Sequence, residues 1–207
     1  MRKIKQHVLS VGGSLIFPEE GLDTSFLGGL RRFIRDRLFE DETQQFAIIV
    51  GGGKIARRYQ DAASEVTKEL TRDDLDWVGI RATHMNAHLV KTLFGDLAHP
   101  DVIIDYDQLP PIDAPVVVGA GWKPGWSTDY DAVIFAKHFG AKTVVNLSNV
   151  DAVYDRDPNR SADAKIISRM SWEEFKSLVG GAWVSGMSAP FDPVAAKRAA
   201  SWDCRWL

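Results

Sequence analysis

The segment "FAIIVGGGKIARRY" (46–59) places three glycines and a lysine between an apolar run and a helical pattern. Glycines let the backbone approach a ligand closely, and a helix start offers free N–H groups to an anion. The segment is not a Walker A loop, because Ile55 follows Lys54 where that motif needs Ser or Thr for magnesium. Residues 51–56 do fit the looser dinucleotide pattern G-x-G-x-x-A, a weak signal alone. The residues predict an anion-binding loop and leave its kind open.

Three further segments carry glycine or polar residues directly after an apolar run. They are Gly12-Gly13-Ser14, "GWKPGWSTD" (121–129) and "LSNVDAVYDRDP" (147–158). In a parallel α/β sheet, the carboxyl ends of the strands share one edge, and ligands bind beyond that edge. Four such loops at one edge predict a roomy site that is built from loops and accepts anions.

Short apolar runs alternate with helical patterns along the whole chain. Strands are expected at 7–11, 46–50, 102–105, 114–119 and 143–147, and helices at about 24–38, 53–70, 75–94 and 129–139, with further helices opening at 171 and 193. Asp23, the Ser171/Glu174 capping box and Asp192-Pro193 mark helix starts. The alternation predicts an α/β fold, a three-layer αβα sandwich around a mostly parallel sheet.

Composition limits the class of protein. The 207 residues are 45% hydrophobic and 26% charged, with a net charge of -3, which suits one globular domain. Basic residues are scattered, so no nucleic-acid partner is expected, and no apolar run is long enough for a membrane span. Cys204 is the single cysteine, which excludes an intrachain disulfide and fits a reducing cytoplasm.

Five motifs, in this order and spacing, resemble the amino-acid kinase superfamily, and most closely its archaeal-type uridylate kinases. They are "SVGGSL", "VGGGKIARRY", "KPGWSTDYDAV", "SNVDAVYDRDP" and "DPVAAKRAA", which together span about residues 8–200. The resemblance implies one amino-acid kinase domain over 1–207, with an acceptor-binding N-terminal part, a nucleotide-binding part over about 135–207 and a short C-terminal end. It also implies transfer of the γ-phosphoryl group of ATP, with Mg²⁺, to UMP in pyrimidine nucleotide biosynthesis, by a cytoplasmic homo-oligomer based on dimers and commonly a hexamer.

The same resemblance assigns site residues motif by motif. Those expected at ATP are Ser10, Gly12, Gly13, Ser14, Gly53, Arg57, Ser148, Asn149, Tyr154 and Asp157. Those expected at the acceptor are Gly52, Asp76, Trp122, Lys123, Pro124, Gly125, Trp126, Ser127 and Thr128. Asp129 matches the aspartate that orders the catalytic centre, and it could also cap its helix. No residue is assigned as a metal ligand, and His84 and His88, four apart, are expected to form an ordinary helix face.

The sequence departs from the family pattern at three places. Many members carry a lysine where this chain has Ser10, and its absence favours the archaeal-type branch. The developing charge on the phosphoryl group then needs another cation, and we predict that Lys123 and Arg57 share this role, with Lys54 as the alternative. Ala152 replaces a glycine, and tryptophans occupy the expected acceptor loop, which leaves the acceptor open.

Two other functions remain open from the sequence. One is a kinase of the same fold for a different small phosphate or carboxylate acceptor. The other is a nucleotide-binding or regulatory module without catalysis, motivated by the missing lysine and the short C-terminal end. A Rossmann dehydrogenase is disfavoured, because its glycine fingerprint should follow the first strand, whereas "GGGKIA" follows the second.

Overall fold

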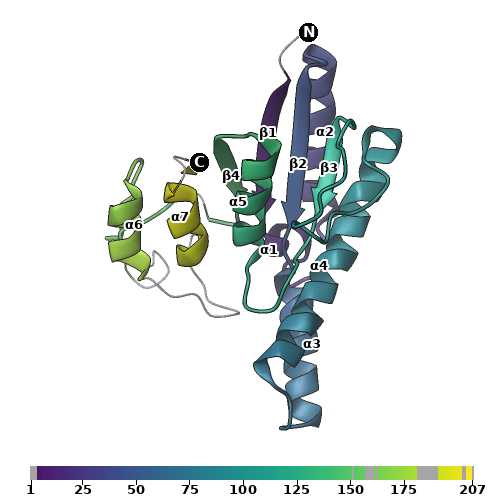
Figure 1. Ribbon diagram of the computed structural model, residues 1–207. Helices are drawn as coiled ribbons and strands as arrows, with labels where there is room; N and C mark the ends of the chain where they lie inside the picture. Colours follow the sequence, from purple (N-terminus) through teal and green to yellow (C-terminus); the bar gives the residue numbers. More distant parts are fainter. Residues whose placement is uncertain are drawn as a thin grey trace.

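The computed structural model describes residues 4–150, 152–156, 161, 163–180, 191–201 and 204–206. Its strands are β1 (Lys5–Val11), β2 (Gln44–Val50), β3 (Val116–Gly119), β4 (Thr143–Leu147) and β5 (Arg205–Trp206). Its helices are α1 (Gly13–Ile16), α2 (Thr24–Glu40), α3 (Gly53–Val66), α4 (Arg72–Phe94), the 3-10 turn η1 (Gly95–Leu97), α5 (Thr128–Phe139), α6 (Trp172–Val179) and α7 (Pro193–Ala200). All strand pairs are parallel, in the order β3-β2-β1-β4-β5 (Figure 1).

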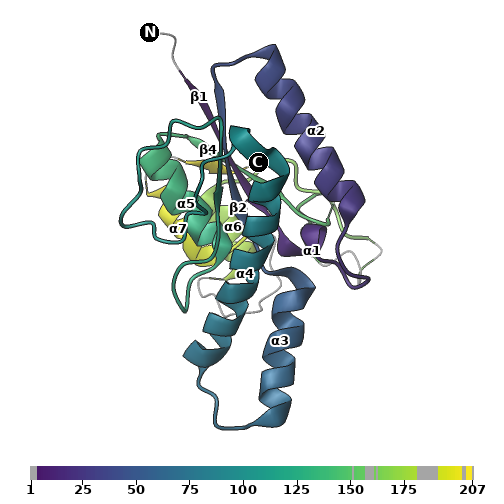
Figure 2. The same ribbon diagram turned by 90° about the vertical axis from the view of Figure 1, so that its right-hand side faces the viewer.

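Helices cover both faces of the sheet, which confirms the predicted fold class. Alternate side chains of β1, β2, β3 and β4 enter separate apolar clusters, as the two-residue period of a strand requires. Val8 of β1 packs with α5 and α7, whereas Leu9 and Val11 pack with α2 and α4. Figure 2 shows α2 and α4 on one side of the strands and α5 and α7 on the other. Strands buried on both faces explain the continuous apolar runs of the sequence.

The predicted helix starts at Asp23, Ser171 and Asp192 are confirmed. Each of these side chains accepts a hydrogen bond from a backbone N–H in the first helical turn, and Ser171 forms its capping box with Glu174. Helix α4 begins at a second capping box, in which Thr71 pairs with Asp74. Within the described residues, no helix is both long and apolar enough to cross a bilayer.

The strand expected at 102–105 is wrong. This segment meets β3 only through an isolated bridge between Ile103 and Gly119. The carboxylate of Asp105 then accepts a hydrogen bond from the N–H of Asp107 at 2.9 Å. A local bond of this kind between side chain and backbone favours a turn over a strand. Ile103 is buried and Ile104 is exposed. The short apolar run therefore belongs to a segment that passes the edge of the sheet without forming a strand.

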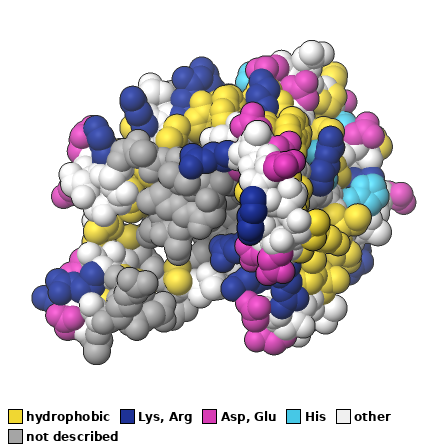
Figure 3. Space-filling model, turned by 90° about the horizontal axis from the view of Figure 1, so that it is seen from below, with side chains coloured by type: hydrophobic (Ala, Val, Ile, Leu, Met, Phe, Trp, Pro, Cys, Tyr) yellow, Lys and Arg dark blue, Asp and Glu magenta, His cyan; other side chains and the backbone are white. Residues whose placement is uncertain are grey.

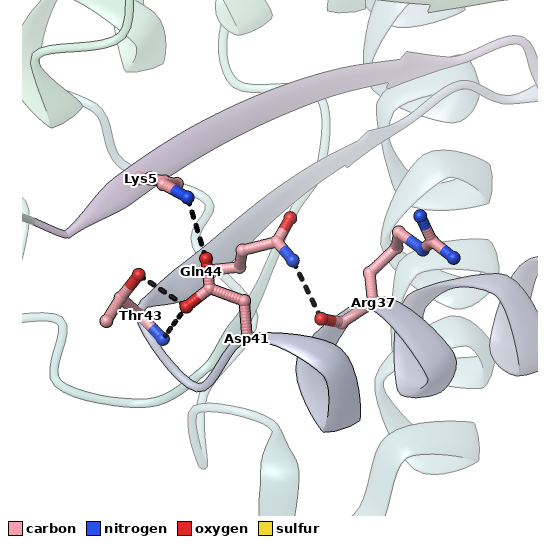
Figure 4. A network of polar contacts seen from close by, with 5 residues as sticks. All are labelled: Lys5, Arg37, Asp41, Thr43 and Gln44. Carbon is pink, nitrogen blue, oxygen red and sulfur yellow. Dashed lines mark hydrogen bonds and ion pairs between the residues drawn. The ribbon is translucent and has the colours of Figure 1, made fainter.

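A polar network fixes the amino edge of the sheet, opposite the glycine loops (Figure 4). Asp41 accepts a hydrogen bond from Lys5 Nζ at 2.8 Å and two more from Thr43, and the amide of Gln44 donates to the carbonyl of Arg37. The ammonium of Lys5, followed by the Thr43 bonds, lowers the pKa of Asp41 well below its usual range. These contacts tie the end of α2 to the starts of β1 and β2.

Candidate active site

A pocket of about 340 Å³ lies at the carboxyl edge of the sheet, where the loops after β1, β2, β3 and β4 meet. The lining residues are Ser10, Gly12, Gly13, Ser14, Gly51, Gly52, Gly53, Ala56, Arg57, Gln60, Asp76, Gly79, Ile80, Thr83, Gly121, Trp126, Ser127, Thr128, Asp129, Asn146, Ser148 and Asn149. The structure therefore brings the expected donor and acceptor residues of four separate motifs into one cavity. Gln60, Gly79, Ile80, Thr83 and Asn146 are lining residues that the sequence did not predict.

The two glycine loops pack backbone against backbone. A Cβ on Gly13 would lie 2.0 Å from the nitrogen of Gly53, and a Cβ on Gly53 would lie 2.3 Å from the oxygen of Gly13. Gly53 also has φ +67, a conformation that favours glycine. The N–H of Gly51 donates to the carbonyl of Val11 at 2.9 Å, so the loops after β1 and β2 form one unit. Glycine is needed here for this close approach, which also sets the floor of the pocket.

Helix α4 holds the loops after β2 and β3 in place. The amide of Asn86 donates to the carbonyls of Gly51 and Gly52, both at 3.0 Å. On the loop after β3, the Gly121 N–H donates to Thr83 Oγ1 at 2.8 Å, and His84 Nε2 lies 2.8 Å from the Gly121 oxygen. A single helix thus sets the width of the pocket between the two loops.

Asp76, one turn from the start of α4, holds the next part of the same loop. Its Oδ2 accepts the N–H of Gly125 at 2.7 Å, while Oδ1 has no hydrogen-bond partner in the described part of the chain. The side chain is 6% exposed and lines the pocket. A buried acceptor without a donor is costly, so this oxygen suits a ligand hydroxyl or N–H group.

Asp129 is not the cap of α5. That position belongs to Ser127, whose hydroxyl accepts the N–H of Tyr130 at 3.1 Å. Asp129 lies two residues further on, where its Oδ1 accepts from Ser10 Oγ at 2.8 Å and its Oδ2 accepts from the N–H of Asp192 at 3.1 Å. The capping interpretation fails because the helix begins one residue earlier than expected, which turns Asp129 toward the pocket.

The pKa of the Asp129 carboxyl is raised to about 6. Burial is the main cause, and the negative charge of Asp192 adds to it, whereas the hydrogen bonds from Ser10 and from the Asp192 N–H lower the pKa. A carboxyl that ionises near neutral pH inside a polar pocket is typical of a functional site.

Asp131 is a buried carboxyl just behind the pocket. It is fully buried, and neither oxygen makes a hydrogen bond of normal geometry with a described residue. Burial raises its pKa well above the usual value, with a smaller contribution from the charges of Asp129 and Asp192, although the backbone N–H of Trp122 opposes the shift. Since the raised pKa favours the protonated form on folding, ionised Asp131 lowers the stability of the folded state.

We therefore expect Asp131→Asn to stabilise the protein increasingly as pH rises. The penalty in the wild type is absent below the ordinary aspartate pKa of 3.8 and grows from there until the raised folded pKa is passed. Thermal unfolding of both proteins at pH 4, 6 and 8 measures this effect. A difference in Tm that stays constant across the series would contradict a buried, titrating carboxyl.

Cations near the pocket differ in their partners. Arg57 lines the pocket, is exposed, and has no ion pair with any described residue. Lys54 Nζ lies 2.7 Å from Glu19, which also pairs with Arg58. Lys123 is not a lining residue: its Nζ lies 3.1 Å from Asp107 and 3.6 Å from the ring centre of Trp122. Of the three predicted cations, the structure thus places Arg57 in the cavity.

The remaining predicted residues lie beside the pocket or beyond it. Trp122 is buried against Tyr106, and Gly125, with φ +79, turns the acceptor loop after Pro124. Tyr154 forms an isolated bridge with Ile166, away from the lining, and Asp157 lies outside the described residues. His84 serves the loop and His88 is exposed, and the described residues contain no cluster of acidic, His or Cys side chains able to hold a metal.

Glycine loops, two helix N-termini and a buried aspartate around one pocket of a parallel α/β sheet define a phosphotransferase of the kind that binds nucleotides. Residues 5–205 match the model of the amino acid kinase family, and the chain belongs to this family.

Named relatives agree with this assignment. The uridylate kinase of Methanocaldococcus jannaschii is 34% identical over 195 residues, covering 92% of this chain and 84% of that protein. That of Methanococcus aeolicus is 33% identical over 194 residues, covering the same shares. Among solved structures, the uridylate kinase of Archaeoglobus fulgidus superposes with a TM-score of 0.78 and 29% identity, covering 98% of this chain and 89% of that one.

Proposed function

We propose that this protein transfers the γ-phosphoryl group of ATP to UMP, giving UDP, as a step of pyrimidine nucleotide biosynthesis. The observation that carries the proposal is the pocket, in which donor-type and acceptor-type loops meet at Asp129. The similarity to uridylate kinases over 92% of the chain supports UMP as the acceptor.

The residues of the pocket suit in-line transfer between two anions. Helices α3 and α5 begin at the pocket, so their N–H groups and positive dipole ends face its interior. Phosphoryl transfer needs little covalent chemistry from the protein; it needs positioning and charge stabilisation. In this proposal Arg57 and the two helix starts offset the charge of the transferring group, and Asp129 keeps them oriented.

We assign the donor and acceptor to opposite sides of the cavity. Ser10 to Ser14, Gly53, Ser148 and Asn149 face the ATP phosphates and nucleoside, within a nucleotide-binding part that spans about residues 135–207. Gly52, Asp76 and the loop from Trp122 to Thr128 face the acceptor. Oδ1 of Asp76, which has no partner among the described residues, supports this side for UMP, because a ribose hydroxyl would supply a donor.

Mg²⁺ is expected to accompany ATP. The described residues offer no carboxylate cluster that fits a metal held by the protein alone. Magnesium commonly enters kinase sites through the phosphates of the nucleotide with few protein ligands, so the residues present suit a metal carried by the substrate. When bound, it would neutralise phosphate charge; the protein's own residues still position both nucleotides.

An acceptor screen with ATP tests the proposed reaction. We expect UMP to be phosphorylated with a higher kcat/KM than CMP, AMP, isopentenyl phosphate or acetylglutamate, measured as ADP release. Turnover of another acceptor but not UMP would support the alternative of a related kinase. Binding of UMP or UTP in calorimetry, without ADP release for any acceptor, would support a regulatory module instead.

We also propose that the protein acts as a cytoplasmic homo-oligomer built from dimers, with up to six subunits. Tyr59 and Val66 of α3 and Trp77 and Met85 of α4 are exposed hydrophobic residues. Figure 3 shows hydrophobic side chains between charged ones in the right half of the view, on the side where α3 and α4 lie. Sedimentation measures the assembly, and a monomer at micromolar concentration would contradict it.

A further inference from the structure

Helices α5 and α7 begin next to each other behind the pocket wall. Asp192 is the N-cap of α7, is 3% exposed and does not line the pocket. Its Oδ1 accepts the N–H of Val194 at 2.7 Å, which is the ordinary capping bond. Its Oδ2 accepts a short hydrogen bond from the hydroxyl of Ser127, the N-cap of α5. One carboxylate therefore joins the starts of two helices.

The backbone of the same residue reaches the pocket aspartate. The Asp192 N–H donates to Asp129 Oδ2 at 3.1 Å, and the other oxygen of Asp129 accepts from Ser10 Oγ at 2.8 Å. Ser127 and Asp129 are two residues apart at the start of α5, and Asp192 contacts both. The contacts connect β1, α5 and α7, three elements that are distant in sequence.

A helix cap alone does not require this arrangement. Asp23 caps α2 with one hydrogen bond, to the N–H of Phe26 at 2.9 Å. Burying a carboxylate is costly unless several hydrogen bonds compensate, and capping is served equally well by an exposed residue. The Oδ2 and the backbone N–H of Asp192 form hydrogen bonds with Ser127 and Asp129, which both line the pocket. These contacts point to a role in the geometry of that pocket.

We propose that Asp192 is a positioning residue for phosphoryl transfer, which holds Ser127 and Asp129 so that the start of α5 keeps one orientation toward the transferring group. This inference rests on the proposed phosphotransfer function. It acts through Asp129 and the α5 N-terminus, since Asp192 itself does not reach the cavity.

The hydrogen bond between Ser127 and Asp192 also gives different roles to the two hydroxyls of the acceptor loop. Ser127 Oγ gives its proton to Asp192 and accepts the N–H of Tyr130, so its proton is not available to an acceptor phosphate. Thr128, the neighbouring lining residue, has no side-chain hydrogen bond to a described residue. Of these two hydroxyls, Thr128 is thus the one left to donate to an acceptor, and Ser127 is part of the support.

Steady-state kinetics on Asp192 variants test the proposal. We expect Asp192→Ala to lower kcat by about 10- to 100-fold, the scale of a small misplacement of reacting groups, with each KM changing by less than about threefold. Asp192→Asn keeps the capping oxygen and can donate from Nδ2 to Ser127, so it should recover most of kcat. In Asp192→Ala/Ser127→Ala, the loss should be smaller than the product of the two single losses.

Asp23→Ala is the matched control. It removes an aspartate N-cap from α2, outside the pocket lining, and should lower Tm while leaving kcat unchanged. If Asp192→Ala loses stability as Asp23→Ala does and keeps wild-type kcat, Asp192 is only a cap and the proposal is overturned.

The pH profile gives a readout that a purely structural role would not change. Three elements bring groups to Asp129: Ser10 from β1, Asp192 from α7 and Asp131 from α5 itself. In the wild type, we expect the acid limb of kcat/KM to report the coupled titration of these carboxyls. Asp192→Asn removes one negative charge that raises the pKa of Asp129, so the limb should move to lower pH. An unmoved limb would contradict the electrostatic coupling of Asp192 to Asp129.

The variants are assayed with whichever acceptor the wild type turns over. A wild type that uses an acceptor other than UMP overturns the proposed substrate and leaves the Asp192 test intact. A wild type active on UMP whose Asp192→Ala variant keeps full kcat overturns the inference alone. Absence of turnover with every acceptor overturns both.

Discussion

Asp129→Asn is expected to lower kcat by about two orders of magnitude or more, the scale of losing a preorganised electrostatic group. The charge of this carboxylate should orient the cation and N–H groups around the transferring phosphoryl, and that interaction strengthens in the transition state. The asparagine preserves the local contacts: its oxygen can accept from the Asp192 N–H, and its Nδ2 can donate to Ser10 Oγ. The variant therefore removes the charge and little else.

Stability should change in the opposite sense. Because the folded pKa of Asp129 is about 6, above the ordinary value of 3.8, ionised Asp129 costs stability once pH has passed through this range. Asp129→Asn should therefore unfold at pH 8 at a Tm no lower than that of the wild type. A large fall in Tm would attribute the lost activity to misfolding.

The pH dependence gives a second measurement. If the ionised form of Asp129 is required, wild-type kcat/KM should fall below about pH 6, and Asp129→Asn should lose this acid limb. Asp73→Asn is a suitable control, since it removes an exposed carboxylate from the first turn of α4 outside the pocket lining. Normal kcat in Asp129→Asn would leave the residue with a structural role only.

Much of the architecture could be predicted because local chemistry determined it. Asp23, Ser171 and Asp192 mark their helices through a side-chain oxygen and the next few N–H groups, a signal within four residues. Apolar runs identified β1, β2, β3 and β4, since strands buried on both faces need such runs. The same pattern failed at 102–105, where the apolar residues belong to an edge crossing that pairs with β3 only at Ile103.

The pocket could be predicted in outline, because parallel strands bring their following loops to one edge. The contacts that shape it join residues far apart in sequence. Nothing local shows that Gly13 packs against the backbone of Gly53, or that Asp192 bonds to Asp129. One signal was available for α4: Thr83 and Asn86, three residues apart, are polar positions on its buried face. Polar groups buried at helical spacing require partners, and the loops supply them.

Arg57→Met is expected to lower kcat by about 10- to 100-fold, the scale of one lost electrostatic donor. With Ser10 where many family members carry a lysine, the transferring group needs a cation from elsewhere. Arg57 lies on the first turns of α3, lines the pocket, and has no ion pair with a described residue. A cation near a helix N-terminus is unfavourable by itself, so a bound anion should be what stabilises it there.

Arg58→Met is the matched control for that variant. Arg58 is the next residue on α3, but its guanidinium pairs with Glu19 and does not line the pocket. Loss of one exposed ion pair changes stability little, so kcat should stay at the wild-type level. Steady-state kinetics over a range of ATP and acceptor concentrations separate a fall in kcat from a raised KM.

Lys123 remains the second predicted cation, and the structure sets a condition on its role. Its ammonium is held between Asp107 and the ring of Trp122, so it must leave the carboxylate to reach a phosphate in the pocket. We expect Lys123→Met to lower kcat less than Arg57→Met. The ammonium of Lys123 would spend part of its time at Asp107, although an exposed ion pair of this kind is weak enough to break. If Arg57→Met and Lys123→Met both keep wild-type kcat while Lys54→Met loses it, the ammonium of Lys54 must exchange Glu19 for the transferring phosphoryl, and the shared role of Arg57 and Lys123 is wrong.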